Sequence, residues 1–173
     1  MGLPTLETAR LTLVPWSLDD IDALHQVWMD PHVRRYLWDD EVISRQRAAA
    51  AVEVAVASAN QGGVGLWCVL LKVARTLAGF CGFRTIGETR DIELIYGLLP
   101  QYCGRGLATE AGGAALAYGF DAGQFTRVYA RADVANRASV RVMERLGMKF
   151  ERETRLGTAP TLIYSLTLPA ERS

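Results

Sequence analysis

The chain has 173 residues, 50% of them hydrophobic, and its 19 Lys and Arg residues balance its 19 Asp and Glu residues. A chain of this length usually folds as one domain with its own core, so we expect residues 1–173 to form a single domain. The zero net charge disfavours a nucleic-acid-binding surface, which needs a basic excess, and no apolar run approaches the ~20 residues of a membrane span.

The cysteine and histidine pattern disfavours a disulfide framework and a structural metal site. Cys68, Cys81 and Cys103 are odd in number and show no CxxC spacing, and the histidines at 25 and 32 lie far from them in sequence. The first residues also lack the basic stretch and apolar core of a secretory signal. We therefore expect no bound metal and a reduced, cytoplasmic compartment.

The first third of the chain predicts one strand and two helices. Residues Arg10–Val14 alternate and end at Pro15, which is typical of a strand. Apolar residues then recur at helical spacing from residue 18 to residue 28, and Ser17 with Asp20 resembles a capping box before them. A second helix is predicted from about Ser44 to Asn60, where Ala is abundant.

The middle of the chain predicts a meander of consecutive strands. Val64–Val73 and Thr76–Thr85 are strand-like runs with a two-residue link, which favours an antiparallel hairpin. Residues 87–90 predict the next turn, and a third run, Ile92–Leu99, stops at Pro100.

Helices and strands alternate in the last third of the chain. The expected elements are a helix over Gly106–Phe120, a strand over Phe125–Ala132, a helix over Asn136–Leu146, and strands over Met148–Thr154 and Thr161–Leu168. Gly147 is placed to end the second helix as a left-handed cap. The element order β-α-α-β-β-β-α-β-α-β-β predicts an α/β domain in which a central mixed sheet is flanked by helices.

The loop Gln101–Glu110 has the sequence features of an anion site. It joins a strand to a helix and carries Gly104 and Gly106, which let the backbone approach a ligand closely. The first amides of a helix have no intrahelical partner, and the helix dipole favours an anion there. A plain strand-to-helix turn would use the same residues. A P-loop and a dinucleotide fingerprint are disfavoured, because no Lys follows and Thr109 stands where the third glycine would be.

Three segments resemble the GNAT superfamily of N-acetyltransferases. Gln101-Tyr102-Cys103-Gly104-Arg105-Gly106 is similar to the family signature Q/R-x-x-G-x-G/A. Leu6–Trp16 resembles the opening strand of the ribosomal-protein N-terminal acetyltransferases, a Rim-type subgroup. Asn136–Ser139, continuing to Leu146–Met148, resembles the second cofactor helix of the family. The resemblance implies a GNAT fold over nearly the whole chain and acetyl-CoA as the acyl donor.

The resemblance also implies which residues hold the cofactor. Backbone groups of Leu98 and Leu99 would pair with the pantetheine arm, Asn136 would hydrogen-bond it, and Ser139 would lie beside it. Asn136 is also a favoured helix N-cap, a role compatible with the first. The remaining implied cofactor residues belong to the signature loop, which Gln101 begins. Its backbone amides at Gly104, Arg105, Gly106, Leu107 and Ala108 would bind the pyrophosphate.

Two side chains are candidates for proton transfer. Glu93 interrupts the apolar residues of its strand and would face away from them, so it could take a proton from an amine directly or through water. A solvated or salt-bridged Glu is the alternative. The family's usual acid is a Tyr seven residues after the Asn, and this chain has Met143 there. Ser139 or a water molecule could protonate the leaving thiolate instead.

The sequence therefore predicts an acetyl-CoA-dependent N-acetyltransferase that acts by direct attack in a ternary complex. The subgroup resemblance favours a protein or peptide N-terminal α-amino group as acceptor. A small-molecule amine acetyltransferase, for an amino acid, polyamine or antibiotic, and a non-catalytic acyl-CoA-binding module are the alternatives. The first two helices and the loop before the last strand are expected to set the acceptor, and the sequence leaves a homodimer open.

Overall fold

A single mixed sheet organises the computed structural model, which describes residues 2–62, 64–123 and 125–168. Over these residues the sheet has eight strands in the order β1-β2-β3-β4-β5-β6-β8-β7. The strands are β1 (Leu6–Glu7), β2 (Leu11–Pro15), β3 (Leu66–Leu71), β4 (Leu77–Ile86), β5 (Asp91–Leu98), β6 (Arg127–Asp133), β7 (Lys149–Leu156) and β8 (Ala159–Thr167). All neighbours pair antiparallel except β5 and β6, which run parallel.

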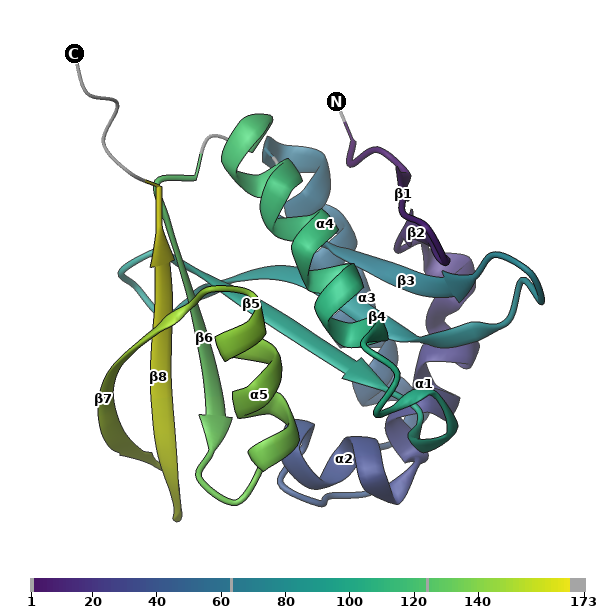
Figure 1. Ribbon diagram of the computed structural model, residues 1–173. Coiled ribbons are helices and arrows are strands. Elements are labelled where there is room, and N and C mark those ends of the chain that lie inside the picture. The colour runs from purple at the N-terminus through teal and green to yellow at the C-terminus, as the bar shows by residue number, and fades with distance from the viewer. Residues whose placement is uncertain (1, 63, 124, 169–173) are drawn as a thin grey trace.

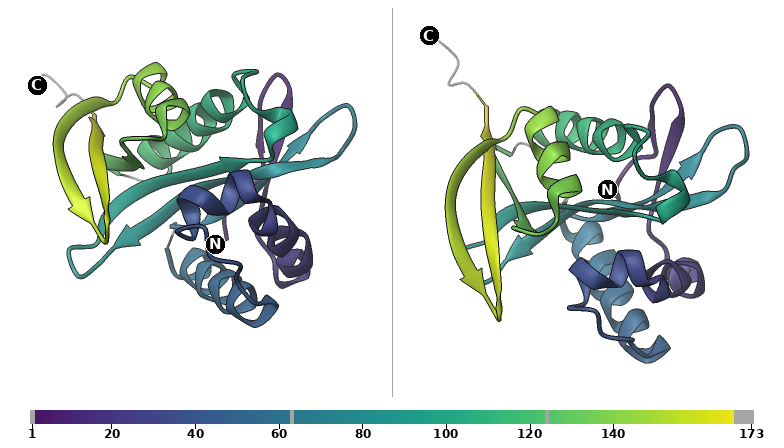
Figure 2. Two further views of the ribbon diagram at one scale, coloured as in Figure 1. Left: turned by 90° about the horizontal axis from the view of Figure 1, so that it is seen from below. Right: turned by 60° about the horizontal axis from the view of Figure 1, so that its bottom comes forward.

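Helices cover both faces of the sheet, which confirms the predicted layered α/β architecture (Figure 1). The described helices are α1 (Ile21–Met29), α2 (Pro31–Leu37), α3 (Arg45–Gly62), α4 (Leu107–Asp121) and α5 (Arg137–Arg145), with short 3₁₀ turns at Leu18–Asp20 and Pro100–Tyr102. Figure 2 shows α1, α2 and α3 on one side of the sheet and α4 and α5 on the other. No helix within the described ranges is long and apolar enough to cross a membrane.

Strands β5 and β6 separate soon after they meet. Their ladder contains one paired position, Glu93 opposite Tyr129. Beyond it, β5 continues to be paired with β4, whereas β6 continues with β8. The two strands therefore diverge toward their carboxyl ends, as Figure 1 shows between β5 and β6. This divergence opens the middle of the sheet, with α2 on one side and α5 on the other.

Apolar side chains fill the two layers between helices and sheet. On the α4 side, the small helix residues Ala111 and Ala115 pack on Phe83, Leu94 and Val128 of the strands. The other layer, against α1–α3, is aromatic and contains Trp16, Trp28 and Phe80 in edge-to-face contacts. Because side chains alternate along a strand, consecutive residues of β5 pack in different layers: Leu94 lies in the α4 layer and Ile95 against the aromatic layer.

The predicted elements are present, and two further ones were not predicted. Asp20 accepts a hydrogen bond from the backbone N–H of Ser17 at 2.8 Å, which is the Asp20 half of the capping box, and a second one from the Ser17 hydroxyl at 2.9 Å. Gly147 has a φ of 81° and ends α5, as expected. Helix α2 and the short β1 were missed. Helix α2 begins at Pro31, and the carboxylate of Asp30 caps it by accepting from the N–H of His32 at 2.8 Å.

Candidate active site

A cavity of about 880 Å³ lies where β5 and β6 diverge. Its walls come from α2, β5, the loop between β5 and α4, the end of β6, α5, and the turn between β7 and β8. The β7–β8 turn, which the sequence analysis expected to help set the acceptor, contributes Gly157 and Thr158. The two helices predicted at residues 18–28 and 44–60 contribute none of the lining residues, and their place is taken by Tyr36 and Leu37 of the unpredicted α2. The cavity therefore lies between the two layers of helices.

The loop before α4 presents a row of backbone donors to this cavity. Gly104 and Gly106 have φ values of 72° and 76°, a left-handed conformation that glycine adopts without strain. Among the described residues, the amides from Gly104 to Thr109 donate no hydrogen bond. The hydroxyl of Thr109, on the cavity wall, is also buried without a partner there. These donors at the positive end of the α4 dipole fit an anionic ligand such as a pyrophosphate.

An ion-pair network fixes this loop to the first two strands. The Glu110 carboxylate accepts from the Thr8 hydroxyl (2.6 Å), the Arg10 N–H (2.8 Å) and Arg10 Nε (2.7 Å). Arg10 in turn donates from Nη1 to the carbonyl of Arg105 at 3.0 Å. Partial burial alone would raise the pKa of Glu110, but the hydrogen bonds from Thr8 and Arg10 outweigh it and lower that pKa. The carboxylate is therefore charged at neutral pH, and through Arg10 it ties the loop to the first two strands.

Glu93 lies on the opposite wall, at the point where β5 and β6 separate. Its side chain is 2% exposed, and its two oxygens accept from Arg131 Nε (2.6 Å), Arg131 Nη2 (2.9 Å) and Arg84 Nε (2.6 Å). Burial alone would raise the pKa of Glu93, but the hydrogen bonds and charges of Arg131 and Arg84 outweigh it, so this pKa lies below its usual value. Glu93 thereby joins β4, β5 and β6, and its carboxylate is engaged rather than free.

A hydroxyl pair lies on the α5 side of the cavity. Asn136 caps α5 by accepting from the N–H of Ser139 at 3.2 Å. Tyr96 of β5 reaches the same residue: its hydroxyl lies 2.9 Å from Ser139 Oγ and donates to the Ser139 carbonyl at 3.0 Å. Burial raises the pKa of Tyr96, so the phenol keeps its proton. Two O–H groups thus lie together on the cavity wall.

Met143 belongs to the core and not to the cavity. It is a fully buried residue of α5 and packs in a cluster that includes Ala130, Ala132 and Tyr164. The hydroxyl of Tyr164, a further strand tyrosine, contacts Glu144 at 3.3 Å. Neither Met143 nor Tyr164 lines the cavity. The tyrosine hydroxyl that contacts Ser139 there belongs to Tyr96 of β5.

Most of the predicted site residues line this one cavity. They are Glu93, Leu98, Gly104, Gly106, Leu107, Ala108, Asn136 and Ser139. Gln101, Arg105 and Leu99 are outside its lining. The backbone groups of Leu99 have partners, because its N–H donates to the Ala78 carbonyl (2.8 Å) and its carbonyl accepts from the Tyr102 N–H (2.9 Å). Since backbone groups alternate in direction along a strand, those of Leu98 point toward β6 instead.

Among the cavity residues that sequence reasoning missed are four polar side chains of the strands: Arg84, Tyr96, Arg131 and Asp133. Arg131 and Asp133 alternate with buried alanines on β6, a pattern that indicates one polar strand face. Arg131 and Asp133 come close to β5 only because β6 lies beside β5 in the sheet. Helix α4 separates these two strands in the sequence, so the sequence does not reveal that they are neighbours. Tyr96 was placed only as an apolar strand residue.

Cys103 and His32 are far apart in sequence but meet at the cavity edge, with Cys103 Sγ 3.5 Å from His32 Nε2. A Cys–His pair is one arrangement for nucleophilic catalysis. Here, however, burial and then the charge of Asp30 raise the pKa of the Cys103 thiol, which disfavours the thiolate.

No group of His, Cys, Asp and Glu suited to a metal is present within the described part of the chain.

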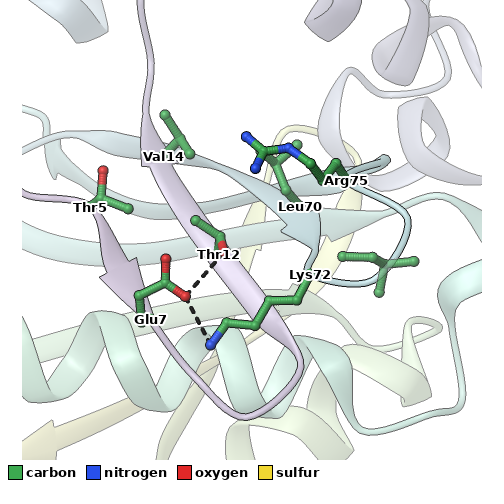
Figure 3. A pocket seen from close by; sticks show the side chains of 8 residues that line it. Thr5, Glu7, Thr12, Val14, Leu70, Lys72 and Arg75 are labelled. Atoms are coloured by element: carbon green, nitrogen blue, oxygen red, sulfur yellow. Dashed lines mark hydrogen bonds and ion pairs between the residues drawn. The ribbon is translucent and has the colours of Figure 1, made fainter.

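A second, smaller hollow of about 450 Å³ lies at the other end of the sheet, between β1, β2 and β3. Figure 3 shows Glu7 between Lys72, at 2.9 Å, and the hydroxyl of Thr12, at 3.1 Å. These charges neutralise each other across the sheet edge. The hollow has no counterpart of the unpaired amides at the head of α4, so we place the active site in the larger cavity.

Comparison with known proteins agrees with this geometry. The family model described as an acetyltransferase (GNAT) domain matches residues 10–149. The chain belongs to the GNAT acetyltransferase family. It is 29% identical over 150 residues to the uncharacterised N-acetyltransferase p20 of Bacillus licheniformis, covering 86% of this chain and 84% of that one.

Two solved structures share the fold at low sequence identity. One is the ribosomal L7/L12 α-N-protein acetyltransferase RimL in complex with coenzyme A, with a TM-score of 0.83, 18% identity, and coverage of 95% of this chain and 98% of that one. The other, from Salmonella typhimurium, is an acetyltransferase that modifies the N-terminal serine of L7/L12, with a TM-score of 0.81, 17% identity, and coverage of 96% and 100%. The predicted GNAT fold and acetyltransferase class are thus confirmed.

The ion pairs of Glu93 lead to a stability prediction. Replacing Glu93 with Gln leaves two guanidinium groups without a buried anion, so the free energy of unfolding should fall by roughly 1–3 kcal/mol at pH 7, allowing for the partial exposure of both arginines. Because the folded pKa of Glu93 is lowered, its contribution is present above the unfolded pKa near ~4.3 and is lost as the pH falls through the folded value.

Urea unfolding of the wild type and of Glu93→Gln between pH 3 and pH 7 measures this difference. The gap between the two proteins should narrow as the pH falls. Glu53→Gln is the matched control, because Glu53 is exposed on α3. A Glu93→Gln protein as stable as this control at pH 7 would show that the three hydrogen bonds contribute nothing to the fold.

Proposed function

We propose that this chain transfers the acetyl group of acetyl-CoA to the α-amino group of a protein or peptide N-terminus. The observation that carries the proposal is the row of unpaired amides from Gly104 to Thr109 beside the divergence of β5 and β6. The amides supply an anion site, and the divergence supplies a channel between the two layers of helices. Membership of the GNAT family supplies the class of reaction.

The residues present fit coenzyme A. The amides of Gly104, Arg105, Gly106, Leu107 and Ala108 would hold the pyrophosphate, and Gln101 begins the same loop. Leu98 would offer its backbone N–H and carbonyl to the pantetheine arm, with Leu99 following it. Asn136 and Ser139 would flank the arm from α5. When bound, acetyl-CoA supplies an acetyl group activated as a thioester, and the protein supplies the orientation and the proton transfers.

Ser139 is the proposed proton donor to the departing sulfur, supported by Tyr96. The Ser139 hydroxyl lies on the cavity wall and is 2.9 Å from the Tyr96 hydroxyl. The raised pKa of Tyr96 keeps the phenol protonated, so its hydroxyl can hydrogen-bond to Ser139 Oγ and orient it while the serine proton passes to sulfur. This pair takes the place of the tyrosine that the family usually carries at the position of Met143.

An α-amino acceptor suits the engaged state of Glu93. An α-amino group has a pKa of ~7.7–8.0, so about a tenth of it is neutral at pH 7. A Lys amine, at ~10.4, is neutral about once in 2,500, a cost of roughly 4.6 kcal/mol. Because Arg84 and Arg131 lower the pKa of Glu93, the site has little basic strength at that position. The structural neighbour that modifies an N-terminal serine supports the same class of acceptor.

Gly106 tests the cofactor part of the proposal. Its φ of 76° strains any β-branched residue, so Gly106→Val should reorient the amides around it. Coenzyme A affinity, measured by calorimetry, should fall by about tenfold or more, which is a loss of about 1.4 kcal/mol. Gly87→Val is the control, because Gly87 has a φ of 50° in the exposed turn between β4 and β5. Equal affinity in the two variants would place the phosphates elsewhere.

An acceptor panel tests the reaction itself. The full chain is incubated with acetyl-CoA and with peptides that have free N-termini, peptides with blocked N-termini and internal Lys, and free amino acids and polyamines. Release of the thiol, corrected for hydrolysis, should be fastest with free peptide N-termini. Transfer only to free amino acids or polyamines would contradict the peptide acceptor and indicate a small-molecule amine acetyltransferase. Cofactor binding without transfer to any amine would indicate an acyl-CoA-binding module.

A further inference from the structure

The wall of the cavity that faces α2 carries a second carboxylate, that of Asp133. Glu93 of β5 is paired with Tyr129 of β6, and the two strands run parallel. Four residues further along each strand, Gly97 of β5 and Asp133 of β6 therefore lie on opposite sides of the opening between the strands. Side chains alternate along β6, and the buried Ala130 and Ala132 face α5. Asp133 therefore shares the opposite face with Arg131, and both line the cavity.

The two carboxylates on this wall differ in their surroundings. The charge of Glu93 is compensated by Arg84 and Arg131, as described above. The Asp133 side chain makes no hydrogen bond or ion pair with any other described residue, although it is only partly exposed. Burial, followed by the negative charge of Asp39, raises the pKa of Asp133. Asp39 follows α2, lines the same cavity and likewise has no ion-pair partner within the described residues.

The charged groups around Asp133 come from every wall of the cavity. Arg84 of β4 and Arg131 of β6 are engaged by Glu93. Asp39 approaches from the segment after α2, and Arg141 and Arg145 of α5 line the cavity from the cofactor side. Asp133 and Asp39 are therefore two carboxylates on the acceptor side of the cavity that have no ion-pair partner among the described residues.

We propose that Asp133 receives the acceptor amine as an ammonium ion and takes its proton, with Asp39 strengthening the negative charge that attracts it. This inference rests on the proposed acetyltransferase function and names its acceptor-binding and proton-accepting residue. A free carboxylate facing the cavity can accept an N–H donor, whereas the oxygens of Glu93 already accept three. Glu93 then acts as a positioning residue that fixes β5, β6 and the two arginines.

The proton balance of the reaction is as follows. The ammonium loses one proton to the Asp133 carboxylate, which releases it to water. The neutral nitrogen bonds to the acyl carbon as the carbon–sulfur bond breaks. Sulfur takes the proton of the Ser139 hydroxyl, and the second nitrogen proton passes through water to restore that hydroxyl, so the products are an amide, a thiol and one proton. A carboxyl with a raised pKa is a better match for an α-ammonium at ~7.7–8.0 than for a Lys ammonium at ~10.4.

The decisive experiment compares Asp133→Asn, Glu93→Gln and a control, Asp121→Asn, which changes an exposed residue at the end of α4. The acceptor is a peptide with a free N-terminus, and kcat/KM is measured from pH 6 to pH 10. Asp133→Asn should lose roughly 10²-fold at pH 7, and the loss should shrink toward pH 9 as the amine becomes neutral unaided. Asp121→Asn should match the wild type throughout.

A second readout does not depend on turnover. Calorimetry of the same peptide with each protein in the presence of coenzyme A should show weaker binding of the charged peptide to Asp133→Asn at pH 6.5, with unchanged binding of coenzyme A. Asp39→Asn should shift the acid limb of the wild-type kcat/KM profile to lower pH, because removing a negative charge lowers the pKa of Asp133.

Three results would overturn the inference. The first is an Asp133→Asn protein with wild-type activity at pH 7, and the second is a loss that is the same at every pH, which a purely structural role would give. The third is a pH-dependent rescue in Glu93→Gln instead, which would make Glu93 the base as the sequence predicted. If the wild type transfers acetyl to no amine, the proposed function fails, and the result is distinguishable from all three.

Discussion

The site depends on one constraint, the single paired position that joins β5 to β6. Glu93 and Tyr129 are neighbours there, and the ion pairs of Glu93 with Arg84 and Arg131 fix three strands at that point. Beyond it β5 remains with β4 and β6 remains with β8, so the sheet must open. Charge-assisted hydrogen bonds from Arg84 and Arg131 to Glu93 hold the strands together where this opening begins.

This opening separates two chemical environments. On the side of α4 and α5, the unpaired amides at Gly104–Thr109 and the hydroxyls of Ser139 and Tyr96 form a wall of donors suited to phosphates and to a departing sulfur. On the side of α2, carboxylates of Asp39 and Asp133 form a wall suited to an amine. The alternation of side chains along β5 and β6 keeps the two walls apart, although their residues are neighbours in sequence.

Local patterns predicted most of the elements and the glycine-containing loop before α4, because caps, glycines and hydrophobic periodicity act over a few residues. Gly104, Gly106 and Asn136 are examples. Contacts between distant segments were not predictable in the same way. The salt-bridged alternative for Glu93 is what the structure contains, but Arg131 reaches it only because β6 lies beside β5. Tyr96 was placed among apolar residues, and its hydroxyl meets Ser139 because α5 packs over the divergence. The pairing of His32 with Cys103 arises from the unpredicted α2.

The central claim is that the amides at the head of α4 receive the cofactor phosphates. Hydrogen exchange of the full chain, with and without saturating coenzyme A, measures this directly. The account predicts slower exchange at residues 104–109 and unchanged exchange in the exposed turn at residues 87–90. Unchanged exchange at residues 104–109, in a sample where calorimetry shows the cofactor bound, would contradict it.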